Sequence, residues 1–188
     1  MSSVLAHGLT AGSIAGAARL RRFEALAVLG FSVLPDLDYA VRLAGLPYDS
    51  AMRPSHSLFV VTALWALAMP PALLAARRLR FVFRRRAVWL CLLAGLLHVG
   101  LDYMIGSSWG DPVLWPLWDG VVSSPFGVLP SSPKPSMTNA HFWKNLTIEA
   151  LVFVPIYLLV GQRWRGRPAL ALVPSLALGL AWGISLPR

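Results

Sequence analysis

Four stretches of the chain are apolar and long enough to cross the hydrocarbon core of a bilayer. They cover residues 57–76, 87–105, 146–161 and 168–184, and each approaches the roughly 20 residues that a spanning helix needs. Two shorter apolar segments, 4–18 and 23–34, precede them. We therefore expect an all-α, polytopic membrane helical bundle of one domain over residues 1–188, with four transmembrane helices and two short N-terminal helices.

The composition agrees with a membrane protein rather than a soluble one. Of the 188 residues, 56% are hydrophobic and only 13% are charged, which leaves too little polar surface for a soluble domain. The net charge of +9 does not indicate nucleic-acid binding, because most basic residues form short clusters between the apolar segments. The single cysteine, Cys91, excludes an intramolecular disulfide and is expected to be a small buried hydrophobe.

The arginine clusters predict how the chain is oriented. They comprise Arg19, Arg21 and Arg22; then Arg77, Arg78, Arg80, Arg84, Arg85 and Arg86; then Arg163, Arg165 and Arg167. If six segments alternate in direction, all three clusters fall on one side, which the positive-inside rule makes cytoplasmic. The four histidines and seven of the eight acidic residues then fall on the opposite side, and only Glu24 remains with the arginines.

The stretch 107–145 lies on that opposite side and is rich in Trp, Pro, Gly and Ser. Tryptophans of this kind favour the headgroup region of a membrane. We expect a long outer loop that lies at the interface as a lid, although a disordered loop is an equal alternative for residues 131–136.

Two sequence motifs place carboxylates near imidazoles or near each other. In "HVGLD", His98 and Asp102 are one helical turn apart on one face and could hold one divalent metal; a hydrogen-bonded buried pair is the alternative. In "VLPDLDY", Asp36 and Asp38 follow a proline. They could chelate a metal, with one of them acting as a general base, or they could simply cap a turn.

Two further motifs add imidazoles and a cation. In "MRPSHSL", His56 lies at the first turn of a predicted helix behind Arg53, and an arginine at a helix N-terminus suits an anion. The alternative is capping by Ser55 with an arginine among lipid headgroups. His7, beside Gly8, could be a ligand or a structural histidine. The roles of His141, Asp111 and Glu149 stay open, with a helix cap one option for Glu149.

Together these motifs predict a metal site. The expected ligands share one depth zone and come from four predicted helices: His7, Asp36, Asp38, His56, His98 and Asp102. Mixed His and Asp ligation suits zinc, manganese or iron, as one or two ions. Such a site can activate a water molecule, and Arg53 would favour an anionic phosphoester transition state. The expected catalytic residues are therefore Asp38 and Arg53.

The order of these motifs resembles that of a family of bacterial inner-membrane, metal-dependent hydrolases that includes a LexA-regulated membrane protein. The shared pattern is His7-Gly8, "PDLD" at 35–38, "RPSHSL" at 53–58, "HVGLD" at 98–102 and "PVLWPLW" at 112–118, which covers about the first 120 residues. The histidine arrangement is also similar, more distantly, to that of zinc-dependent phospholipases C. The resemblance implies a membrane hydrolase with a divalent metal and hints at a phospholipid-like substrate.

We accordingly expect a multi-pass protein of the bacterial inner membrane with a zinc site on the non-cytoplasmic face. It would hydrolyse a phosphoester in a lipid or lipid-linked substrate, with the bilayer as its other partner and no nucleic acid. The alternatives are a non-catalytic metal-binding or transport component, and a scaffold whose polar cluster only holds helices together. Acids in transport paths normally connect both membrane faces, and Glu24 is the sole acid expected on the inner side.

Overall fold

Helices account for nearly all regular structure in the part of the chain that the computed structural model describes, residues 3–38, 44–45, 53–104, 110–125, 127, 138–161 and 172–185. The α-helices are α1 (Val4–Ala17), α2 (Arg22–Val33), α4 (Leu58–Arg78), α5 (Arg85–Tyr103), α6 (Ala140–Ile156) and α7 (Val173–Ser185). Two 3-10 turns, η1 (Leu34–Leu37) and η2 (Pro54–His56), follow α2 and precede α4, and a π-helical turn, η3 (Tyr157–Gly161), extends α6. The all-α class and the two short N-terminal helices are confirmed.

Three helices are long and apolar enough to cross a membrane: Leu58–Arg78, Arg85–Tyr103 and Ala140–Val160. They correspond to three of the four predicted spans. In the region of the fourth, the structure describes α7, which has only 13 residues, fewer than the roughly 20 that a spanning helix needs. Residues 162–171 lie outside the described part of the chain, so a fourth span stays a prediction.

The boundary predicted for the outer loop is wrong at its end. Helix α6 begins at Ala140, because Asn139 caps it: its side chain accepts a hydrogen bond from the backbone N–H of His141 at 3.0 Å. The last residues of the expected 107–145 loop therefore belong to a helix. Within residues 110–125, Asp111 and Val122 pair through an antiparallel bridge, so this part of the loop is a folded hairpin.

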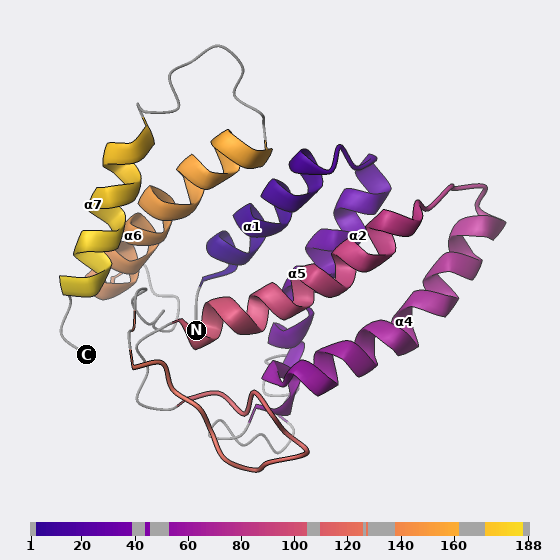
Figure 1. The fold of residues 1–188 in the computed structure, drawn as a ribbon, viewed down its shortest axis with the longest axis horizontal. Coiled ribbons are helices and arrows are strands. Elements are labelled where there is room, and N and C mark those ends of the chain that lie inside the picture. Colours follow the sequence, from indigo (N-terminus) through magenta and orange to yellow (C-terminus); the bar gives the residue numbers. More distant parts are fainter. Residues whose placement is uncertain are drawn as a thin grey trace.

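Helix α5 lies at the centre of the bundle, with α1 and α2 on one side and α4 on another (Figure 1). The core between α1, α2, α4 and α5 contains Ala11, Val28, Phe31, Met69, Cys91 and Ala94. A Cβ atom at Gly95 would lie 2.8 Å from Cγ1 of Val61 and 3.4 Å from the carbonyl oxygen of Phe31. Gly95 therefore lets α4 and α2 approach α5 closely, one turn before His98.

Helices α6 and α7 pack together on the other side of α1. Close approach again depends on glycine: a Cβ at Gly179 would lie 2.9 Å from side-chain atoms of Leu151 and Val152. A Cβ at Gly12 of α1 would lie 2.9 Å from the ring of Tyr157, whereas a Cβ at Gly8 would meet nothing within 4 Å. Gly12 therefore allows α1 to approach η3 closely.

The two ends of the bundle carry different polar groups. The α1–α2 and α4–α5 turns meet at one end, where Arg84 contacts the carboxylate of Glu24 and the carbonyl oxygen of Arg19. The first two arginine clusters therefore share an end, as expected, while the third lies outside the described residues. The start of α1, η1, η2 and the end of α5 meet at the opposite end.

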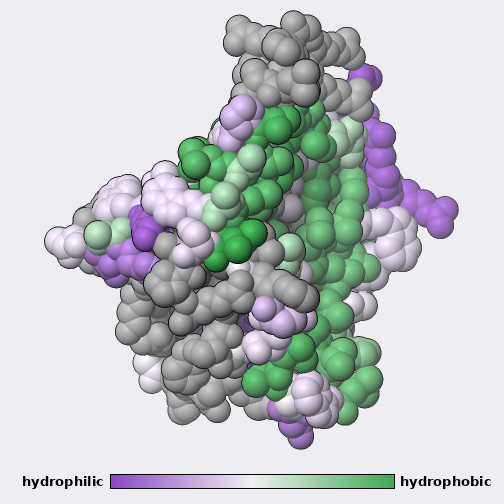
Figure 2. All heavy atoms as spheres, turned by 60° about the vertical axis from the view of Figure 1, so that its left-hand side comes forward, coloured by the Kyte–Doolittle hydropathy of each residue, from purple (hydrophilic) through white to green (hydrophobic). Residues whose placement is uncertain are grey.

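Between these ends the surface is largely apolar. Figure 2 shows hydrophobic residues gathered in a continuous band that runs over most of the height of the visible face, with strongly hydrophilic residues at its margins. Helix α4 also turns large apolar side chains outward, among them Leu67, which is 74% exposed. An exposed apolar surface of this extent suits a lipid environment.

Candidate metal centre

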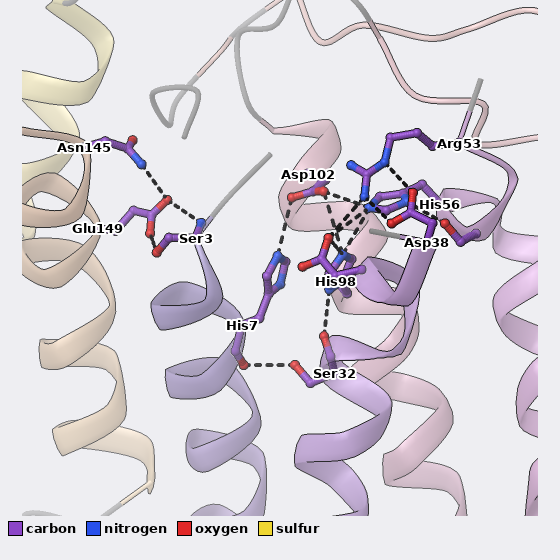
Figure 3. Close-up of polar contacts among 12 residues, drawn as sticks. Ser3, His7, Ser32, Asp38, Arg53, His56, His98, Asp102, Asn145 and Glu149 are labelled. Carbon is purple, nitrogen blue, oxygen red and sulfur yellow. Dashed lines mark hydrogen bonds and ion pairs between the residues drawn. The ribbon is translucent and has the colours of Figure 1, made fainter. Parts of the chain in front are cut away.

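Four potential metal ligands come together from three parts of the chain (Figure 3). Asp36 lies in η1, which directly follows α2, and His56 is the last residue of η2, which directly precedes α4. A proline near the start of each 3-10 turn fixes its first backbone angle. His98 and Asp102 extend from one face of the last two turns of α5. The fold thus assembles two imidazoles and two carboxylates.

The ligand atoms of these four residues all lie within 4.8 Å of one another. The His56 Nε2 atom is 3.2 Å from Asp102 Oδ2, 3.3 Å from His98 Nε2 and 3.6 Å from Asp36 Oδ1. The His98 Nε2 atom is 3.7 Å from an oxygen of each carboxylate. The two histidines and Asp102 are almost completely buried, whereas the side chain of Asp36 is 15% exposed.

These spacings fit a small divalent cation. A tetrahedral zinc ion with bonds of about 2.0–2.1 Å separates its ligand atoms by about 3.3–3.4 Å, close to the five distances just given. Without a positive charge between them, the two carboxylates would repel each other in this buried position. The residues present therefore suit a metal ion, with Asp36, His56, His98 and Asp102 as its ligands.

The orientation of His98 is fixed from outside this group. Its Nδ1 atom lies 2.7 Å from the backbone carbonyl oxygen of Ser32. A carbonyl oxygen only accepts, so Nδ1 carries the hydrogen and Nε2 presents its lone pair to the other three residues. Metal-ligating histidines are normally held in this way by a second hydrogen bond. Ser32 was not predicted from the sequence, because a backbone carbonyl leaves no residue-type signal.

The carboxylates and imidazoles of this group shift each other's pKa values. Burial raises the pKa of Asp36, but contact with His56 and the charge of His98 lower it more, so the net shift is downward. Burial lowers the pKa of His56, and its contacts with Asp102 and Asp36 outweigh this and raise it. A proton on His56 can thus provide the positive charge that the carboxylates need, and a metal ion would take its place.

His7 lies against this group rather than within it. Its ring stacks on that of His98, with centroids 3.6 Å apart and planes 10° from parallel. Its Nε2 atom is 3.5 Å from Asp102 Oδ1, while Asp102 Oδ2 faces His56 and His98. His7, which was predicted as a ligand, therefore lies beside the centre. It contacts the carboxylate oxygen of Asp102 that is not the one facing His56 and His98.

Asp38, predicted as a ligand or general base, is bound to Arg53. The Arg53 Nε and Nη2 atoms donate to the two oxygens of Asp38 at 2.7 and 3.0 Å, and Nη2 also donates to Asp36 Oδ1 at 3.2 Å. Arg53 is buried, with 8% of its surface exposed. The structure thus places Asp38 and Arg53 beside the centre, joined to it through Asp36, and their catalytic roles stay predictions.

The hairpin at residues 110–125 packs against the start of α4. The backbone N–H of Leu58 donates to the carbonyl oxygen of Val113 at 3.0 Å, and the Ser57 hydroxyl donates to that of Trp115. Both donors directly follow His56 in the chain. At the surface of the hairpin, Leu117 is 75% exposed and Trp118 is 50% exposed, as expected for a segment at a membrane interface.

A second polar group holds the start of α1 to α6 (Figure 3). The backbone N–H of Ser3 donates to Glu149 Oε1 at 2.9 Å, and the Ser3 hydroxyl donates to Oε2. Asn145 Nδ2 contacts Oε1 at 3.4 Å. Glu149 thus pairs with the residue that precedes α1 rather than capping its own helix, and this fixes α1 four residues before His7.

The fold and this centre define a class: an all-helical membrane protein with a potential metal site of two histidines and two aspartates. The family model described as "YdjM inner membrane protein" matches residues 1–186. The chain belongs to this family of bacterial inner-membrane proteins, which confirms the expected inner-membrane location. The multi-pass arrangement and the non-cytoplasmic position of the centre stay predictions. Neither the curated proteins nor the solved structures give a match. Hydrolase activity and the likeness to zinc-dependent phospholipases C stay predictions.

Proposed function

We propose that this protein is a metal-dependent hydrolase that cleaves a phosphoester in a lipid or lipid-linked substrate. The observation that carries the proposal is the group formed by Asp36, His56, His98 and Asp102, whose ligand atoms lie within 4.8 Å of one another. Zinc suits the 3.2–3.7 Å separations between each histidine and its partners and the equal mixture of nitrogen and oxygen ligands. Manganese and iron, and a second ion, are the other candidates.

A divalent ion in this position would act as a Lewis acid on a phosphoryl oxygen and would lower the pKa of a bound water. The chain would supply the remaining groups. Arg53 touches Asp36 and carries the positive charge needed to hold a phosphate. Asp38 is kept in place by Arg53 and is the proposed general base. Phosphate binding would require Arg53 to share its donors between the substrate and the two aspartates.

The location of the centre supports a lipid substrate. His98 and Asp102 lie in the last two turns of α5, a helix that is long and apolar enough to cross a membrane. The most exposed of the four ligands is Asp36, on the side where Arg53 and Asp38 lie. We place this end on the non-cytoplasmic face of a multi-pass protein, because the first two arginine clusters lie at the opposite end.

The test is elemental analysis of the purified protein in lipid nanodiscs, followed by a screen of phosphorylated lipids. We expect one or two divalent ions per chain and release of phosphate or a phosphorylated headgroup from at least one lipid. A His98→Ala variant should lose both metal and activity. His141→Ala is the matched control, because His141 is exposed on the first turn of α6. A stable wild-type protein without metal would contradict the proposal.

A non-catalytic metal-binding component is the second candidate, favoured by the burial of the ligands. The His56 and His98 side chains have no exposed surface, and Asp102 has 1%, which restricts access for a substrate. Firmly bound metal without hydrolysis of any lipid in the screen would select this function. Transport is less well supported, because Glu24 at the opposite end is already paired with Arg84.

A further inference from the structure

An apolar groove runs between α1, α5 and α6, outside the metal centre. Its volume is about 420 Å³, and its walls are almost entirely apolar. The residues that form its three walls include Thr10 and Ile14 of α1, Leu93 and Leu97 of α5, and Phe153 and Ile156 of α6. The groove is open to the surroundings, since Leu93 is 42% exposed and Leu97 is 37% exposed.

One end of the groove lies under the polar layer that contains the metal centre. On α1, Thr10 follows His7 by three residues, so both lie on one helical face. On α6, Phe153 follows Glu149 by four residues in the same way. On α5, Leu101 lines the groove and directly precedes Asp102. All three walls therefore lead from apolar residues to buried polar residues.

The length of the groove matches one leaflet of a bilayer. Leu90 and Leu101 both line it, and the α5 segment between them rises about 16 Å at 1.5 Å per residue. The hydrocarbon core of a bilayer is about 30 Å thick. The α5 segment that lines the groove is therefore about as long as one leaflet of the hydrocarbon core is thick.

We propose that this groove binds one hydrocarbon chain of the phosphorylated lipid whose headgroup lies at the metal centre. This inference rests on the proposed function and adds a way of recognising the substrate. Two of the three walls, α5 and α6, come from helices that are long and apolar enough to cross a membrane, so lipid tails would surround the groove. Its lining offers a polar headgroup almost nothing to bind, and the Ser13 hydroxyl is taken by the carbonyl oxygen of Leu9 at 2.8 Å.

The proposal explains how a lipid could reach a buried centre. A molecule that enters sideways from the bilayer would place its tail against Leu93 and Leu97 and would carry its phosphate upward, toward His7 and Asp102. The tail would then fix the depth of the phosphoester through van der Waals packing against the groove walls, since association within a bilayer is driven by packing rather than by removal of apolar surface from water. Water-soluble phosphoesters lack this contact and should be poor substrates.

The test uses phosphatidylglycerol with a photoreactive diazirine in the middle of one acyl chain. The full-length protein is placed in nanodiscs of phosphatidylethanolamine and phosphatidylglycerol that contain this probe, irradiated and mapped by mass spectrometry. We expect labelling concentrated on the groove residues of α1, α5 and α6. Labelling spread equally over the groove and the outward face of α4 would overturn the proposal, as would cross-links between two copies of the chain through the groove.

A matched pair of variants sharpens the result. Leu93→Trp should fill part of the groove and reduce its labelling about fivefold, the change expected for a loss of about 1 kcal/mol. Leu67→Trp makes the same replacement on the outward face of α4 and should leave groove labelling unchanged. Equal labelling in both variants would overturn the proposal. If Leu93→Trp does not fold, the wild-type map alone decides.

Metal content and lipid hydrolysis, measured on the same samples, separate this proposal from the proposed function. Labelling away from the groove, with metal and hydrolysis intact, would contradict lipid binding in the groove but not the proposed hydrolase function. Labelling in the groove of a protein that has no metal and cleaves no lipid would remove the proposed function, and with it the assignment of the bound chain to a substrate.

Discussion

The two ends of the helical bundle each bury acidic residues, but the partners of the carboxylates differ between the two ends. At one end, the Glu24 carboxylate accepts hydrogen bonds from the side chain and backbone N–H of Arg84 and from the backbone N–H of Arg21. At the other end, the Asp36 and Asp102 carboxylates face His56 and His98 at 3.2–3.7 Å. His7 lies 3.5 Å from Asp102, and Arg53 contacts Asp36.

This difference distinguishes a structural ion pair, at Glu24, from a candidate metal site, at Asp36 and Asp102. A carboxylate with charged and neutral donors on both oxygens needs nothing more, and the Glu24 group simply holds the α1–α2 turn to the start of α5. The Asp36 and Asp102 carboxylates lie beside a histidine whose lone pair also points inward. The charge of their imidazole partners depends on protonation, so a divalent cation can take the place of a proton in this group.

The largest expected effect is at the metal centre. Asp102→Asn keeps the side-chain shape but removes the charge that faces both His56 and His98. We expect metal affinity to fall by more than about 100-fold, beyond the 10–100-fold typical of residues that only support a ligand, and lipid hydrolysis to disappear. Metal titration monitored by mass spectrometry in nanodiscs measures this. Metal affinity equal to wild type would show that the two ends do not differ as argued.

Asp38→Asn tests whether the groups beside the centre act in chemistry or only in metal binding. We expect bound metal to stay near the wild-type level and kcat for the best lipid substrate to fall by roughly 10²–10⁴, as for loss of a general base. The comparison of metal content with kcat is the measurement. Parallel loss of metal and activity would instead make Asp38 part of metal retention.

Glu24→Gln should affect stability without affecting the metal. Arg84 would lose its charged partner, and we expect a cost of about 1–3 kcal/mol, measured as a lower Tm in detergent. Metal content should be unchanged, because the substitution lies at the opposite end of α2 from Asp36. A large loss of bound metal in this variant would mean that the two ends are coupled.

The same pair predicts a pH effect. Hydrogen bonds from Arg84 hold the pKa of Glu24 at about 2, below its ordinary value of 4.5. A lowered pKa stabilises the folded protein above about pH 4.5, and this contribution is lost as the pH falls from 4.5 toward 2. The Tm of the wild type should therefore approach that of Glu24→Gln over this interval. A constant difference in Tm between them would contradict the assignment.

The smallest expected effect is that of Ser32→Ala. The Ser32 hydroxyl donates to the carbonyl oxygen of His7 at 2.9 Å, and its loss should cost about 0.5–1.5 kcal/mol of stability. The contact that orients His98 uses the Ser32 backbone carbonyl, which the variant retains. Metal affinity should therefore stay within a factor of about two, and a much larger loss would show that the hydroxyl also positions the centre.

The sequence predicted the helices well because their signal is local. Apolar runs between arginine clusters located α1, α2, α4 and α5 to within a few residues. The start of α6 was missed by six residues, because Asn139 and Ala140 follow a polar stretch without an apolar period. The four residues of the metal centre were predicted from local motifs. Helical spacing indicated His98 and Asp102, the paired carboxylates after a proline indicated Asp36, and the start of a predicted helix indicated His56.

The sequence could not predict how the remaining polar residues pair. Whether Asp38 faces the metal centre or Arg53 depends on its side-chain direction just after η1. The position of His7 depends on how α1 packs against α5. The partner of Glu149 is Ser3, 146 residues away, and no spacing rule connects them. Contacts between distant segments require the assembled bundle.

The hydrogen bond between His98 Nδ1 and the Ser32 carbonyl has a practical consequence. The Nδ1 hydrogen is buried and should exchange slowly with water, so nitrogen-15-labelled histidine can give it an observable NMR signal. Its chemical shift would respond to an ion on the opposite nitrogen of the same ring. That signal can report occupancy of the centre, and competition among different ions, before any natural substrate is known.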